Sequence, residues 1–299
     1  MWLELHMFGF RALWSPYYLL FVAVLCSLYY YLTGPGRKSG EEKPEVHQQI
    51  MFYSGMALLY IIKGSPIDLI GHILFSAHMT QMALYYLLFP ILIVKGVPRW
   101  IWEKVFYLKG LNKVLHVLTK PLIALILFNG LFSLYHMPDV FDFTKSNWMA
   151  HAVIGTIILF TAFCMWWSIF SPLEEMDTLS PLLKIGFIFA NGVLITPACG
   201  LIIFASHPLY ETYASSGSWV QAMSLCVPAD VLNSLPSSLS GPGFFTNLPL
   251  IEDQQLGGVI MKISQEIIFG VVIAYIFFSW FNREKDTIDP LPSHLQSES

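Results

Sequence analysis

The side chains that could do chemistry in this sequence are found mainly among its nine histidines and its methionines. His78 and Met82 are four residues apart within an apolar stretch, and Gln81 lies beside them. On a helix this spacing places His78 and Met82 on one face, about 40° apart. Neutral imidazole and thioether together favour copper, especially Cu(I), because thioether is a soft ligand. The pair therefore predicts part of a copper site.

Other histidines stand near the ends of apolar stretches on the same side of the predicted bundle. His136 follows the fourth stretch and His151 begins the fifth. His72 lies about 9 Å from His78 along a helix axis, at a rise of about 1.5 Å per residue. The candidate metal ligands are therefore His78, Met82, His136 and His151, with His72 as a weaker candidate.

A structural role is the alternative for each of these residues. A single interfacial histidine is more often hydrogen-bonded than a ligand, and this applies to His6, His72 and His207 taken alone. Methionines such as Met261 commonly fill gaps in helical bundles. His78 differs because it lies more than one turn inside its apolar stretch, where an unpaired polar group is costly.

The composition indicates that a membrane surrounds these residues. The 299 residues are 55% hydrophobic and 12% charged, and the mean hydropathy is +0.59. A membrane-spanning helix needs about 20 apolar residues, and the apolar runs here are continuous rather than alternating, which favours helices over a barrel. We predict an all-α membrane bundle of about seven transmembrane helices, forming one domain over residues 1–283. The expected spans are 16–32, 50–62, 73–94, 118–134, 149–170, 182–205 and 258–281.

The distribution of Lys and Arg predicts the orientation. Twelve of them fall on one side of the predicted spans and four on the other, and cytoplasmic loops carry the excess. The N-terminus is therefore expected outside and the C-terminus in the cytoplasm, so the candidate histidines face the outer side. Residues 206–257 form a long external loop, either a lid or docking surface or a loosely ordered segment. Residues 284–299 are expected to be a disordered cytoplasmic tail.

Several function classes receive no support from the sequence. The net charge of −4 is small, and no basic stretch predicts binding to nucleic acid. The four cysteines form no Cys-x-x-Cys pair, which argues against thiol redox chemistry. No Gly-x-Ser-x-Gly, His-Glu-x-x-His or phosphate-binding loop is present, so we expect no catalytic residues and no enzyme.

Two segments resemble the CtaG family of assembly factors for caa3-type cytochrome c oxidase, in its multi-spanning Bacillus-type form. They are residues 65–82, with Ser65-Pro66 and Ser76-Ala77-His78-Met79-Thr80-Gln81-Met82, and residues 253–258, Asp-Gln-Gln-Leu-Gly-Gly. The resemblance covers most of the chain in order. The family motif is usually His-Met-x-Gln-His, and Met82 stands where the second histidine would be, which leaves a His/Met pair.

The resemblance implies a non-enzymatic protein of the cell membrane that is required to form active caa3-type oxidase. It implies that oxidase subunits are the partners and that copper is delivered or inserted at the outer face, with no other cofactor. Two alternatives remain open. One is a copper transporter across the membrane, and the other is a haem-binding electron carrier, since facing histidines in a bundle can be axial ligands.

Overall fold

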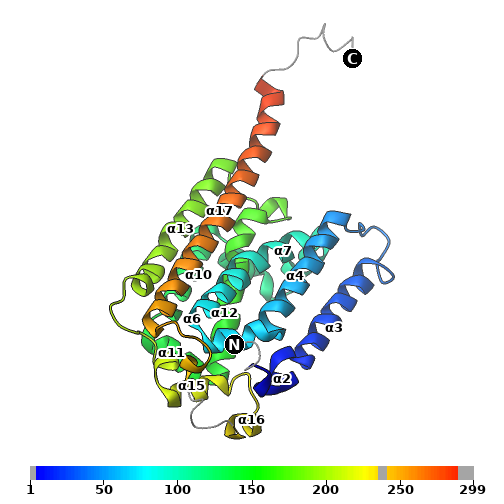
Figure 1. The fold of residues 1–299 in the computed structure, drawn as a ribbon. Helices are drawn as coiled ribbons and strands as arrows, with labels where there is room; N and C mark the ends of the chain where they lie inside the picture. The colour runs from blue at the N-terminus through cyan, green and yellow to red at the C-terminus, as the bar shows by residue number, and fades with distance from the viewer. Residues whose placement is uncertain (1–4, 235–240, 289–299) are drawn as a thin grey trace, which may run out of the picture.

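The computed structural model describes residues 5–234 and 241–288 and contains helices and no strands in these ranges (Figure 1). The longer segments are α3 (Pro16–Thr33), α4 (Val46–Gly64), α10 (Pro121–Tyr135), α12 (Trp148–Phe170), α13 (Pro181–Ile203), α17 (Leu250–Ile288), and α6 (Phe75–Met82), which continues through η2 (Ala83–Leu88) into α7 (Phe89–Gly96). The shorter ones are η1 (His6–Phe8), α2 (Gly9–Trp14), α5 (Pro66–Ile73), α8 (Arg99–Phe106), α9 (Leu111–Leu118), α11 (Pro138–Ser146), η3 (Glu174–Met176), α14 (Glu211–Ala214), α15 (Ser216–Met223), α16 (Ala229–Ser234) and η5 (Pro242–Phe244).

The prediction of an all-α membrane bundle is confirmed. Five helical segments are long and apolar enough to cross a membrane, and the number is up to seven if each of two bent pairs is one span. The bent pairs are α4 with α5, at 47°, and α9 with α10, at 80°. The predicted start of the last span at residue 258 is wrong, because α17 already begins at Leu250. The orientation across the membrane stays a prediction.

Prolines define where many of these helices begin. Pro16, Pro66, Pro121, Pro138 and Pro181 each occupy the first turn of a helix. This position suits proline because its φ is preset for a helix and the N–H that it lacks would have no partner there. The positions of these prolines in the sequence therefore mark where the five helices begin.

A π-helical segment, η2, lies where Pro90 follows in the same helix. Proline cannot donate to the carbonyl four residues earlier, and its ring pushes that carbonyl away. The carbonyl is that of Tyr86, and it accepts a hydrogen bond from the Trp166 indole N–H of α12 at 3.3 Å. The indole replaces the missing backbone donor and joins α12 to the irregular turn.

The N-terminus of α6 is capped from the far end of the sequence. The residue before it, Leu74, has no side chain that can accept a hydrogen bond. The Asp253 carboxylate of α17 accepts instead from the Phe75 backbone N–H at 2.7 Å, and also from the backbone N–H and the hydroxyl of Ser76. A negative charge at a helix N-terminus also interacts favourably with the helix dipole. This contact fixes the start of the helix that carries His78.

The two glutamines after Asp253 connect α17 to the end of α13. Gln254 accepts from the Leu209 N–H at 2.7 Å, and Gln255 donates to the Ala205 carbonyl at 3.1 Å. Gly257 permits the close approach of α17 to α6, because a Cβ there would lie 2.6 Å from the Phe75 ring. The Asp-Gln-Gln-Leu-Gly segment is thus a structural junction in the first turns of α17.

The described part of residues 206–249 packs against the N-terminal helices. Trp219, Met223, Val227 and Phe245 are buried in one hydrophobic cluster together with Phe8 of η1. Two alternatives were expected for this segment, a lid or docking surface and a loosely ordered loop. The second is wrong for the described residues, because they pack in this cluster. At the other end of the chain, α17 includes residues 284–288 of the predicted disordered tail, and residues 289–299 lie outside the described ranges.

We expect Asp253→Ala to lower the thermal unfolding midpoint of the detergent-solubilised protein by a few degrees. Loss of a helix cap costs about 1 kcal/mol, and buried N–H groups left without an acceptor raise that cost. Glu252→Ala is the matched control, because Glu252 is its exposed neighbour on the same helix. Equal midpoints for the two variants would show that the cap does not hold α6.

Candidate metal site

The candidate histidines come together at one end of the bundle. His72 lies in α5, His78 in the first turn of α6, His136 directly after α10, and His151 in the first turn of α12. All four lie at the end occupied by α11 and α15, where the N-terminal helices also lie (Figure 1). We call this the α11 end. The arrangement follows from the alternating direction of the spans, which brings residues 72–78, 136 and 151 to a common level.

The first pair is formed by His78 and His136. Their ring centroids are 6.4 Å apart, and both side chains are buried. The Nε2 atom of each ring has no hydrogen-bond partner among the described residues. A buried polar atom without a partner is uncommon in native proteins and calls for an explanation such as a bound ion or water.

The other ring nitrogen of His136 determines which atom can bind a metal. Nδ1 lies 2.7 Å from the Phe132 carbonyl. Because a carbonyl can only accept, Nδ1 carries the proton and Nε2 has a free lone pair. Metal-binding histidines are commonly oriented in this way by a carbonyl or carboxylate behind the ring. Burial also lowers the pKa of His136 to about 4, so the ring is neutral at pH 7.

The second pair is formed by His72 and His151, whose ring centroids are 5.9 Å apart. Nδ1 of His72 lies 2.9 Å from the Asp68 carbonyl, so its Nε2 again has a free lone pair, and neither that atom nor Nδ1 of His151 has a partner among the described residues. Within the described ranges, no three His, Cys, Asp or Glu side chains are close enough together to hold a metal ion. The histidines are therefore arranged as two pairs, and the proposal that they bind a metal stays a prediction.

Aromatic rings surround the first pair. The Phe141 ring meets His78 edge-on at 5.2 Å, and Tyr210 stacks on Phe75 at 4.7 Å. The Tyr210 hydroxyl donates to the His136 carbonyl at 2.9 Å, which ties the 206–249 segment to this pair. The rings exclude water from the two free nitrogen atoms and restrict the motion of the imidazoles.

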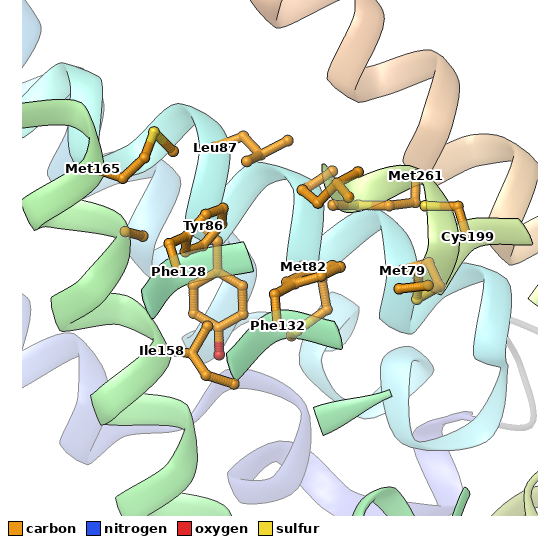
Figure 2. Packing of buried hydrophobic residues seen from close by; sticks show 14 of the residues in the cluster. Met79, Met82, Tyr86, Leu87, Phe128, Phe132, Ile158, Met165, Cys199 and Met261 are labelled. Atoms are coloured by element: carbon orange, nitrogen blue, oxygen red, sulfur yellow. The ribbon is translucent and has the colours of Figure 1, made fainter. Parts of the chain in front are cut away.

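The sulfur atoms divide into buried and exposed groups. Met82 is buried in the hydrophobic cluster that also contains Met79, Met261 and Cys199 (Figure 2). It lies one helical turn after His78, so the thioether is on the same side of α6. Met137 is 49% exposed, which removes it from the buried site. The role of Met82 as a sulfur ligand stays a prediction.

Three polar residues beside the second pair were not among the sequence-based candidates. Lys63 pairs with Asp68 at 3.2 Å, and the Gln81 amide donates to the Ile62 and Ile67 carbonyls at 2.9 and 3.0 Å. Gln81 thereby satisfies carbonyls at the bend between α4 and α5. The sequence signal for this network was a Lys, an Asp and a Gln inside apolar stretches, where charged and amide groups require partners.

Lys145 is the other residue that the sequence did not reveal. It lies in α11 and is 1% exposed, and its ammonium group is 5.7 Å from the centroid of the Phe141 ring. Burial, with a smaller contribution from the Lys63 ammonium, lowers the pKa of Lys145 to about 7. A lysine in a short polar helix normally faces water, so only the tertiary structure shows that this one is enclosed.

The fold and the site define a polytopic helical membrane protein with buried histidine pairs at one end. Residues 27–283 match the family model of the cytochrome c oxidase caa3 assembly factors, Caa3_CtaG, and the chain belongs to this family.

Uncharacterized proteins of Mycobacterium bovis and Mycobacterium tuberculosis are similar to this chain, each 24% identical over 282 residues and 88% of the chain. The chain spans 38% of the length of these curated relatives. No solved structure matches it.

We expect Lys145 to make stability rise with pH. Its pKa in the folded protein is about 7 against an ordinary 10.5. Between these values the unfolded chain binds a proton that the folded protein does not, so the free energy of unfolding increases from pH 7 upwards and is lowest below pH 7. From pH 7 to 9, the unfolding midpoint of the wild type should rise by a few degrees relative to that of Lys145→Met. Lys113→Met, at an exposed site, serves as the control. The same pH response in all three proteins would contradict the lowered pKa of Lys145.

Proposed function

We propose that this protein is a non-enzymatic assembly factor that passes copper to a caa3-type cytochrome c oxidase at the outer face of the cell membrane. Copper is the cargo rather than a resident cofactor. The observation that supports the proposal best is the pair of free Nε2 atoms of His78 and His136. They are buried together, and at least the His136 ring is neutral at pH 7. Membership of the caa3 assembly-factor family supports the choice of partner.

The available donors suit Cu(I) better than harder ions. The two imidazole nitrogens and the Met82 thioether are borderline and soft ligands, and a thioether has little affinity for magnesium or calcium. In the proposed complex, His78 and His136 bind the ion through Nε2, and Met82 supplies the sulfur. The His72–His151 pair lies further along the same end and is a weaker, second position for the ion.

The side of the membrane comes from the charge distribution. The excess of Lys and Arg, twelve on one side of the predicted spans against four on the other, supports an orientation with the α11 end outside. In that orientation the site faces the side on which an extracytoplasmic copper centre would be loaded. Copper that binds to a site at the outer face also does not have to cross the bilayer.

The two alternative functions have less support. A transporter requires ligands at successive depths, and His116 in α9 is separated from the histidine pairs by the apolar cluster of α7, α10 and α12. A haem carrier requires a large cavity next to its axial ligands. A cavity of about 440 Å³ lies between α3, α4, α7 and α12, and no histidine is among the residues that line it. Phe141, Tyr135 and Tyr210 occupy the space around the first pair instead.

The test compares His78→Ala with His116→Ala in cells that make caa3-type oxidase. His78→Ala removes one of two strong donors, and we expect oxidase activity to fall about tenfold or more while the protein still accumulates in the membrane. His116→Ala should leave activity unchanged, because the His116 ring is partly exposed and is hydrogen-bonded to the Asn112 carbonyl of its own helix, at 2.8 Å.

Protein abundance is measured by immunoblot in each strain, since loss of a buried polar group can act through folding. Normal oxidase activity with His78→Ala would overturn the proposed site. Equal losses with both variants would indicate general destabilisation or a transport path through the bundle.

A further inference from the structure

An ion pair lies on α17 in the middle of the membrane-spanning region. Lys262 and Glu266 are one helical turn apart, with Nζ 2.7 Å from Oε1. The same Nζ donates to the Gln265 side chain at 2.8 Å and to Thr196 of α13 at 3.2 Å. These contacts are with α13 and α17, whereas the histidine pairs lie at the α11 end of the bundle.

The neighbouring helix gives the depth of this ion pair. Gly258 of α17 approaches Ile202, and Gln265 approaches Gly192, so α17 and α13 run antiparallel in contact. Gly192 is eleven residues from each end of α13 (Pro181–Ile203). At about 1.5 Å per residue this is about 16 Å from either end, which is half of a hydrocarbon core of about 30 Å.

The two charges differ in their surroundings. The Lys262 side chain is 28% exposed and has several acceptors from α13 and α17, whereas the Glu266 side chain is 62% exposed. Charged side chains within a membrane almost always face the bundle interior, because hydrocarbon offers no hydrogen bonds. A carboxylate that faces outward at this depth is therefore costly unless another protein covers it.

The surface around Glu266 has the form of a helix-packing face. Ile263, Ile267 and Val271 point away from the bundle and are 55 to 66% exposed. Gly270, one turn after Glu266, has open space around the position of a Cβ. A small residue on a lipid-facing strip allows another helix to approach closely, and polar side chains join membrane helices by hydrogen bonds. We call these five residues, 263, 266, 267, 270 and 271, the α17 face.

We infer that the α17 face docks a transmembrane helix of an oxidase subunit that carries an N–H or O–H donor at mid-membrane depth. This inference rests on the proposed function for the identity of the partner. The donor would bind the carboxylate oxygen of Glu266 that Lys262 does not occupy. A basic side chain on the partner would complete a Lys–Glu–cation arrangement, and an amide or hydroxyl would complete a hydrogen bond.

A second copy of this chain fits the α17 face less well. Two copies related by an axis along the membrane normal would place both Glu266 carboxylates at the same depth. Each carboxylate would then face another acceptor rather than a donor, because the Lys262 ammonium of each copy already binds the Glu266 of its own helix. A partner helix with a donor at this level offers the complementary hydrogen-bonding group instead.

The test uses a photo-crosslinking amino acid at Ile267 or Val271 of the full chain in native membranes. The matched control is Ile126 of α10, which is 58% exposed and also apolar. Irradiation should join an oxidase subunit to positions 267 and 271 and not to 126, as identified by mass spectrometry. Glu266→Leu should reduce the adduct yield about tenfold, because loss of an interhelical hydrogen bond in a membrane costs about 1–2 kcal/mol. Glu266→Gln, which keeps an acceptor, should retain most of it.

Adducts between two copies of the chain, equal yields at 267 and 126, or no effect of Glu266→Leu would each overturn the inference. Its failure is separable from failure of the proposed function. If deletion of the whole chain abolishes oxidase activity while positions 267 and 271 give no subunit adduct, only the α17 face is disproved. If the deletion leaves oxidase activity normal, the proposed function itself is wrong.

Discussion

The contact between Asp253 and the N-terminus of α6 is the interaction on which the candidate site depends. The chain breaks its helical path at Leu74, and the break leaves backbone N–H groups of α6 without acceptors inside an apolar bundle. The carboxylate of a residue 178 positions away satisfies them, and its charge complements the helix dipole. Because His78 lies in the first turn of that helix, its position is determined by α17 as much as by α6.

Without a ligand, the buried histidine nitrogens lower the stability of the folded protein. Each buried nitrogen without a partner costs about 1–3 kcal/mol relative to a hydrogen-bonded one. Among the described residues, such an atom is found in each of His72, His78, His136 and His151. The Phe141 ring packs edge-on against His78, and the Tyr210 hydroxyl of the 206–249 segment binds the His136 carbonyl, so the first pair is held in place despite that cost. A ligand that binds these nitrogen atoms would recover that cost.

The sequence predicted the membrane-spanning helices well, but it predicted poorly where α6 and α17 begin. Continuous apolar runs identify the spans through α10, α12 and α13 to within a few residues, since hydrophobicity alone determines which segments enter a membrane. The same signal does not mark the break at Leu74, which is itself apolar, or the start of α17 at Leu250. The start of α6 after Leu74 depends on hydrogen bonds to Asp253, a residue distant in the sequence.

For the candidate site, the residues could be predicted from the sequence, but their arrangement could not. Residue type and position relative to the spans found His78, His136, His151 and His72, because polar groups in apolar stretches stand out. Their arrangement as two pairs could not be predicted, because it depends on how four helices pack. The enclosure of Lys145 could not be predicted either, because α11 is a short polar helix, and its packing against the rest of the bundle exists only in the folded protein.

In the proposed function, the imidazole nitrogens of the first pair hold copper together with the Met82 thioether. X-ray absorption spectroscopy of the purified protein loaded with Cu(I) tests this directly. We expect about one copper per chain, with a first shell of two nitrogen scatterers at imidazole distances and one sulfur scatterer, and loss of one nitrogen in His136→Ala. A shell of sulfur alone, or no copper retained above that of His78→Ala, would contradict the proposed site.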